Sequence, residues 1–435
     1  MFEREMMDFI DRSPVNFYAV RNVALMLDKA GFVRLNEGDV WHLQAGGRYY
    51  TTRNDSSLIA FRIPEGEACG FMMVSAHCDS PCFKVKENPE SDVLGKYTRI
   101  SVEGYGGMLM APWFDRPVSV AGRAYVRTNS GLEMRLVNID RDILMFPSLA
   151  IHMDRKANDG HEYKKNVDMV PLFGGECEKG ALKRLVAESL EVEAQDIVST
   201  DLFTYNRDKC RLWGANEEFL SGSRLDDLMC AYAGAKAFVD SDEAKNVQVL
   251  AIFDNEEVGS LTRQGACSTF MADVLKRVSA LYGGDDAFRR MIANSLNVSA
   301  DNAHAVHPNF PELTDPNNRC YLNGGVVIKK NASQKYASDA YSRALFIKVC
   351  EEAGVKYQCF ENRPDMPGGS TLGNLLNYSV SVATVDVGLA QLAMHSPYET
   401  AGREDVDSLV EVLKQLYKMH IKNLGVTINV EFKDV

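Results

Sequence analysis

One stretch of the sequence decides the fold: Val74-Ser75-Ala76-His77-Cys78-Asp79-Ser80-Pro81. Residues 70–76 are an apolar run that predicts a buried strand, and polar residues begin where this strand ends, at His77. In open α/β sheets, ligands bind outside the carboxyl ends of the strands. The stretch therefore predicts an α/β sheet and marks a candidate functional site at one end of it.

Two later segments have the same form, an apolar strand that is followed by carboxylates or histidine. Residues 247–253 predict a strand, which runs into Asp254-Asn255-Glu256-Glu257. Residues 296–299 predict another strand, which is followed by Asp301 and His304. All three strand ends therefore place possible metal ligands or acid–base groups where ligands bind in this class of fold.

The segments around these strands alternate between helical and extended patterns. Ser13-Pro14 predicts the start of an amphipathic helix that ends at Gly31, and residues 49–52 and 58–63 predict short strands. Further helices are predicted after Ser223, over residues 337–354 with a glycine stop, and from residue 406 with Asp405 or a neighbour as its cap; residues 380–387 predict a strand. This alternation favours a three-layer α/β/α domain.

The predicted secondary structure changes between residues 91 and 220, where short strands replace the alternation of helices and strands. Residues 97–102, 118–126 and 132–137 are β-rich pieces, separated by Gly, Asn and charged turns. We therefore predict a β-rich domain, residues 91–220, inserted into an α/β domain formed by residues 1–90 and 221–435.

Composition excludes several classes of protein. The 435 residues are 46% hydrophobic and 25% charged, as in ordinary globular proteins. The net charge of −12 argues against a nucleic-acid partner. No apolar run approaches the roughly 20 residues of a membrane helix, and charges interrupt any signal-peptide core. Ten scattered cysteines suit a reducing compartment, so we expect a cytoplasmic protein without a membrane partner.

The pair His77 and Asp79 has a meaning at metal sites. A ligating imidazole usually donates its other N–H to a carboxylate, which fixes the orientation of the ring. His77 would then bind a metal and Asp79 would orient it. A buried histidine paired with an acid for structure alone is the alternative interpretation of an isolated His-x-Asp.

Glu256 and Glu257 are adjacent carboxylates that leave a strand. Their side chains diverge, so one can bind a metal while the other accepts a proton from water, which suits metal-assisted hydrolysis. A solvated acidic loop is the alternative for such a run.

Five of these candidate residues together indicate a metal site more strongly than any one of them does alone. Two imidazoles and three carboxylates suit two zinc ions that share a bridging carboxylate, with the metals roughly 3.5–4 Å apart. Glu256 then remains free as a base. Singly, Asp226 could serve only the helix dipole and His395 could be structural. The proposed ligands are His77, Asp226, Glu257, Asp301 and His395.

At these residues the sequence resembles the aspartyl aminopeptidase family, the tetrahedral cytosolic zinc aminopeptidases. The resemblance covers nearly the whole chain. The matching segments are residues 75–82, 113–116, 150–153, 223–227, 254–260, 299–309 and 394–396.

The resemblance implies a phosphorylase-like catalytic domain, a β-rich oligomerisation domain and a tetrahedral dodecamer that acts on peptides. It implies that Asp226 bridges two divalent ions, Zn²⁺ with Mn²⁺ or Co²⁺ as alternatives. His77 and Asp301 would complete one site, Glu257 and His395 the other, with Glu256 as the general base. It also implies that His152 reaches the active site of a neighbouring subunit; a surface or core histidine is the alternative.

The sequence indicates the substrate preference less clearly than it indicates the metal ligands. Lys329 matches a family lysine suited to an acidic substrate side chain, which implies removal of N-terminal Asp or Glu. His304, Gly369 and Ser370 match positions near the substrate. Residues 366–374, however, depart from the eukaryotic pattern of Cys-Gly before the Ser/Thr pair and Ile-Gly-Pro after it. A neutral aminopeptidase or deacylase therefore stays open.

Two further alternatives come from other classes. A catalytically silent assembly protein would have little reason to keep every proposed ligand and Glu256. A thiol enzyme is suggested by Cys78 and Cys82, but an extended backbone would point Cys78 away from His77 and Asp79.

Overall fold

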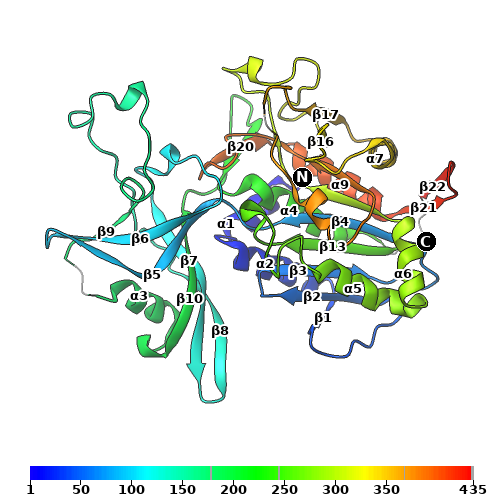
Figure 1. The fold of residues 1–435 in the computed structure, drawn as a ribbon, viewed down its shortest axis with the longest axis horizontal. Helices are drawn as coiled ribbons and strands as arrows, with labels where there is room; N and C mark the ends of the chain where they lie inside the picture. Colours follow the sequence, from blue (N-terminus) through cyan, green and yellow to red (C-terminus); the bar gives the residue numbers. More distant parts are fainter. Residues whose placement is uncertain (177–178, 243–244, 367, 433–435) are drawn as a thin grey trace.

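The main domain is built on a nine-stranded sheet with the order β1-β2-β3-β13-β4-β14-β18-β16-β17 (Figure 1). The computed structural model describes residues 1–176, 179–242, 245–366 and 368–432. The strands of this sheet are β1 (Val33–Leu35), β2 (Arg48–Arg53), β3 (Ser57–Arg62), β4 (Phe71–His77), β13 (Val247–Phe253), β14 (Leu296–Ala300), β16 (Val326–Lys330), β17 (Tyr357–Glu361) and β18 (Thr384–Gly388).

Strand register brings distant parts of the sequence to one end of this sheet. β4, β13, β14 and β18 are parallel, and Phe253 pairs with His77 while Ser299 pairs with Ser75. The residues that follow β13 and β14 therefore emerge beside His77. The three strand ends predicted to carry the site do meet at one edge.

Helices cover both faces of the large sheet, because its strands alternate between two apolar cores. Val74 and Leu250 belong to one core, Met73 and Val249 to the other. This confirms the expected three-layer α/β/α architecture. The first face packs against α1 (Glu3–Asp11), α2 (Asn16–Lys29), α4 (Leu225–Asp240), α7 (Ala340–Ala353) and α9 (Asp405–Tyr417), and the second against α5 (Phe270–Ser279), α6 (Asp285–Ala293) and α8 (Leu372–Leu376).

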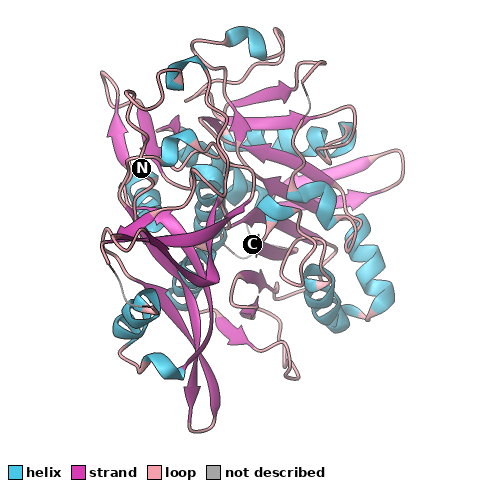
Figure 2. Ribbon diagram, turned by 60° about the vertical axis from the view of Figure 1, so that its left-hand side comes forward, coloured by secondary structure: helices cyan, strands magenta, loops and turns pink. Residues whose placement is uncertain are grey.

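A six-stranded antiparallel sheet, the insert sheet, stands beside the main domain (Figure 2). It runs from Cys82 to Asn206, whereas the predicted insert covers residues 91–220. A helix, α3 (Ala181–Leu190), packs on it and was not predicted. Its strands are β5 (Cys82–Val93), β6 (Tyr97–Tyr105), β7 (Val118–Thr128), β8 (Gly131–Asn138), β9 (Leu172–Gly174) and β10 (Ile197–Asn206).

A small sheet and a hairpin complete the described chain, and neither was predicted. The small sheet has the order β11-β12-β20-β19-β15 and returns the chain from the insert sheet to the main domain. The elements are β11 (Arg211–Trp213), β12 (Phe219–Gly222), β15 (Ala303–His304), β19 (Ala390–Leu392), β20 (Glu399–Gly402) and the hairpin β21 (Met419–Asn423) and β22 (Ile428–Phe432). No helix of the described residues has the length and apolar character needed to cross a membrane.

Two predicted helix starts differ from the structure. α2 begins at Asn16, not at Ser13-Pro14, because the Ser13 hydroxyl donates to Phe9 O and so closes the preceding helix α1. α9 begins at Asp405 with the neighbouring Glu404 at its N-cap position, and the Asp405 carboxylate accepts the N–H groups of Asn323 and Gly325 instead of capping its own helix. In both cases the side chain expected to cap the helix hydrogen-bonds to a residue outside that helix.

The packing of α4 on the sheet predicts a large effect for one core residue. Leu250 is fully buried, and its Cδ1 would lie 3.2 Å from a Cβ added at Gly234 of α4. We expect Leu250→Ala to lower the free energy of unfolding by about 2–5 kcal/mol. Leu94→Ala, at a residue that is 92% exposed, should change it by less than about 0.5 kcal/mol. Urea unfolding of the two variants checks this, and equal midpoints would contradict the described core.

Candidate metal centre

The first group of possible ligands lies where β4 ends and α4 begins. Ligand atoms of His77, Asp226 and Asp227 lie within 4.8 Å of one another, and all three residues are buried. His77 Nε2 is 3.7 Å from Asp226 Oδ1. Asp227 Oδ2 accepts the backbone N–H of His77 at 3.2 Å, so this carboxylate ties the strand end to the helix.

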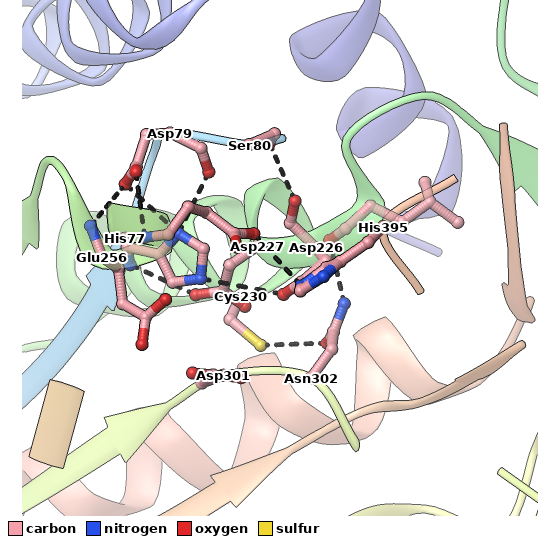
Figure 3. A network of polar contacts seen from close by, with 12 residues as sticks. His77, Asp79, Ser80, Asp226, Asp227, Cys230, Glu256, Asp301, Asn302 and His395 are labelled. Carbon is pink, nitrogen blue, oxygen red and sulfur yellow. Dashed lines mark hydrogen bonds and ion pairs between the residues drawn. The ribbon is translucent and has the colours of Figure 1, made fainter. Parts of the chain in front are cut away.

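The second group shares Asp226 with the first. It contains Asp226, Glu257 and His395, again with ligand atoms within 4.8 Å. His395 Nε2 lies 3.3 Å from both Asp226 Oδ2 and Glu257 Oε1. A carboxylate that belongs to two ligand groups has the position of a bridging ligand. Figure 3 shows His77 and His395 with Asp226 close to both imidazoles.

Asp301 lies near these groups but is in neither of them. It follows β14 and lines the same cavity as His77 and Glu257. Its Oδ1 is 3.3 Å from Lys329 Nζ, which also donates to Asp301 O at 2.7 Å and Asn302 O at 3.3 Å.

Asp79 holds the turn that carries Glu256 and Glu257. Its carboxylate accepts the backbone N–H of Glu256 at 3.1 Å and of Glu257 at 3.2 Å. His77 Nδ1 is 3.0 Å from the backbone O of Asp79 and 3.5 Å from its Oδ1. Asp79 therefore contacts both His77 and the Glu256 turn, and the second contact was not foreseen from the sequence.

Glu399 supports the centre from behind and was also missed. Its Oε2 accepts the backbone N–H of Asp226 at 3.0 Å, and its Oε1 accepts that of His395 at 2.8 Å. One buried carboxylate thus fixes the backbone of a residue from each group. Nothing in the sequence around Glu399 distinguishes it from a surface acid.

Glu256 is the carboxylate of this cluster without a protein partner. No donor among the described residues hydrogen-bonds to its side chain, which faces the cavity. Burial and, to a smaller extent, the charges of Asp301 and Asp79 together raise the pKa of Glu256 to about 8, against the lowering effect of His77. A poised carboxylate of this kind can exchange a proton with water near neutral pH.

The donor set fits a divalent cation. Asp226 Oδ1, Asp227 Oδ1 and Glu257 Oε1 are buried and accept no hydrogen bond. Burial raises the pKa of Glu257 well above its usual value, and the charge of Asp226 adds to this. Buried carboxylates are stable when paired or when they coordinate a metal. Imidazole and carboxylate ligands are those that zinc uses.

A cavity of about 320 Å³ opens over these residues. Lys329, which is 1% exposed, and Tyr336 both line this cavity, and the Lys329 ammonium lies 5.1 Å from the centre of the Tyr336 ring. Pro367, in the quoted segment 366–374, lies outside the described residues. The predicted site residues on the cavity wall are His77, Asp226, Glu256, Glu257, Asp301, His304, Lys329, Gly369, Ser370 and His395.

His152 and Cys78 lie away from this cavity. His152 is exposed in the segment between β8 and β9, which projects from the insert sheet (Figure 1). The Cys78 thiol donates to Ser56 O and Phe253 O, and burial raises its pKa well above the usual value. Cys78 is therefore a protonated core thiol and not a nucleophile at this site.

Comparisons with known proteins give matches over nearly the whole chain. The model of the aminopeptidase I zinc metalloprotease family (M18) matches residues 9–417. A probable M18 family aminopeptidase 2 of Clostridium acetobutylicum is 42% identical over 427 residues, 96% of this chain and 99% of that protein. The cryo-EM structure of the Ape4 and Nbr1 complex matches with a TM-score of 0.93 at 34% identity, over 95% of this chain and 85% of that chain. The S. cerevisiae mApe1 dodecamer matches with a TM-score of 0.84 at 28% identity, over 95% of both chains.

The family match, residues 9–417, includes the large sheet, the insert sheet and both ligand groups. The alignment with the Clostridium acetobutylicum relative covers almost the whole length of that protein. The resemblance inferred from the seven motifs is thereby confirmed. The chain belongs to the aminopeptidase I family of zinc metalloproteases, the M18 family.

Proposed function

We propose that this enzyme is a two-metal aminopeptidase that removes an N-terminal acidic residue from peptides. One observation carries the proposal: two ligand groups share Asp226, while Glu256 stands beside them without a partner. Asp226, Glu257 and His395 would hold one ion. His77, Asp226 and Asp301 would hold the other, with Asp301 from the cavity wall in place of Asp227, whose Oδ2 already accepts the His77 N–H. The ions would be zinc, with manganese or cobalt as alternatives, because His and carboxylate ligands serve all three.

The side chains divide the work of hydrolysis among them. Bound divalent ions polarise the peptide carbonyl and lower the pKa of water. Glu256 accepts the proton of the attacking water and returns it to the leaving amine. Asp79 fixes the Glu256 turn through two N–H groups, so the base keeps its place during both proton transfers.

Lys329 is the cation that supports an acidic preference. Among the described residues, Lys329 is the only lysine or arginine that lines the cavity. A substrate carboxylate beside it would form a buried ion pair. A neutral preference is the second candidate, since three acceptors on Asp301 and Asn302 already surround its ammonium.

Assembly is the remaining part of the proposal. The mApe1 neighbour is a dodecamer, and exposed Leu149, Ile151 and Met153 flank His152 on the projecting segment. We infer that the insert, predicted as residues 91–220, forms the contacts of a tetrahedral dodecamer and brings His152 to a neighbour's site. The nine described free cysteines suit a reducing, cytoplasmic location.

Glu256→Gln should lower kcat by about 10²-fold or more while the metal content stays unchanged, because the base is lost and the ligands remain. Glu257→Gln is the matched comparison and should lose metal, since its Oε1 belongs to the second ligand group. Reporter hydrolysis and elemental analysis of both variants check this. A metal-depleted Glu256→Gln would instead make Glu256 a ligand.

Substrate preference is tested by kcat/KM for Asp, Glu, Leu, Lys and Ala reporters, with an N-acetylated control. We expect Asp and Glu to be preferred and the acetylated substrate to be inert. Lys329→Met should then reduce activity on acidic reporters alone by about 10-fold or more, as loss of a buried charge partner does. An equal loss on all reporters, with less bound metal, would show that Lys329 serves Asp301 only.

The role of His152 is tested by mixing subunits. His152→Phe leaves the ligands of its own subunit intact, and Asp226→Ala removes the ligand that both groups share while keeping His152. Hybrid oligomers of the two should recover activity that neither parent has. Recovery is measured after dissociation and reassembly, and hybrids that stay inactive would contradict the cross-subunit role.

A further inference from the structure

The insert sheet reaches the catalytic residues directly. Where β6 ends, residues 105–109 leave the insert sheet and lie against two parts of the metal centre. We call this segment the insert brace. It contacts the turn of residues 254–257 through Tyr105 and Gly106, and it contacts His395 through Leu109.

Tyr105 is the centre of the first contact. Its hydroxyl donates to Asp79 Oδ2 at 2.7 Å and accepts from Asn255 Nδ2 at 2.8 Å. Burial raises the pKa of Tyr105 well above its usual value, so the hydroxyl keeps the proton that it donates. The same Asp79 carboxylate accepts the N–H groups of Glu256 and Glu257. Tyr105 therefore holds the turn at two points, through Asp79 and through Asn255.

Gly106 and Leu109 make the other contacts of the brace. Gly106 has a φ of +75°, and a Cβ added there would lie 3.2 Å from Glu257 Cβ and 3.4 Å from Pro81 Cβ. Leu109 N–H donates to the backbone O of His395 at 3.0 Å. A shift of the insert sheet would thus displace the base turn and one ligand together.

We propose that Tyr105 is a positioning residue for the catalytic base and that the insert brace couples the insert sheet to the metal centre. The inference rests on the proposed role of Glu256. Tyr105 touches neither substrate nor ligand; it keeps the Glu256 and Glu257 backbone in the conformation that directs one carboxylate to the substrate water and the other to the metal.

Tyr105→Phe removes only the hydroxyl. We expect kcat to fall by about 10- to 100-fold, with KM and metal content unchanged. Losses of this size are typical of residues that orient catalytic groups by hydrogen bonds without binding the metal themselves. In the metal-loaded enzyme, the amides of Glu256 and Glu257 should exchange hydrogen faster. Tyr205→Phe is the matched control, because Tyr105 and Tyr205 both line a second, smaller cavity, and the Tyr205 hydroxyl donates to Asn138 Oδ1 within the insert sheet. It should leave kcat and both amides unchanged.

A pair of glycines tests the packing. Gly106→Ala and Gly95→Ala place a side chain at similar positive φ just after and just before β6, but a Cβ added at Gly95 (φ +67°) would meet nothing within 4 Å. Both carry the same backbone strain. Only Gly106→Ala should lower kcat and increase exchange at Glu257.

Particle size is measured for each variant, so that loss of assembly is separated from loss of positioning. The proposal is overturned if assembled, metal-loaded Tyr105→Phe keeps its kcat, or if Tyr205→Phe loses as much. It is likewise overturned if the exchange of the Glu256 amide does not change. Full activity of Glu256→Gln would instead refute the proposed base, and the two failures are therefore distinguishable.

Discussion

Mutual repulsion among buried carboxylates is the interaction on which the site depends. Asp226, Asp227 and Glu257 present oxygens that accept no hydrogen bond, and the ammonium of Lys329 is already paired with Asp301. Such a cluster is costly to bury unless a cation joins it. The backbone must therefore hold the carboxylates in place before the cation arrives, and the hydrogen bonds of Asp79 and Glu399 do this.

The sheet brings the ligand-bearing segments together, and the carboxylates of Asp79 and Glu399 hold their backbone in place. Register between β4, β13 and β14 places three chain segments side by side, which determines the positions of the Cα atoms. The direction of each side chain is then decided by backbone contacts such as His395 N–H to Glu399. A metal site needs both, because ligand distances vary little for a given ion.

The sequence predicted the parts of this arrangement that are local. Apolar runs that end in polar residues identified β4, β13 and β14 and the acids after them, because a buried strand and its end are recognisable from a few consecutive residues. Glu399, Tyr105 and the pairing of Lys329 with Asp301 left no such pattern, because each depends on a partner that is distant in the chain. The wrong start of α2 has the same origin: the Ser13 hydroxyl suits a cap, but Phe9 O takes it.

The position of the insert sheet in the chain has a consequence for how such enzymes can diversify. The chain enters this sheet at Cys82, directly after the segment 78–81 that follows His77, and it leaves at Asn206 to reach Asp226 through the small sheet. Two residues of one ligand group are thus separated by an entire folded unit. Exchange of this unit between relatives would have to preserve both junctions and the contacts of residues 105–109, so a change in the insert sheet and a change in active-site geometry are inherited together.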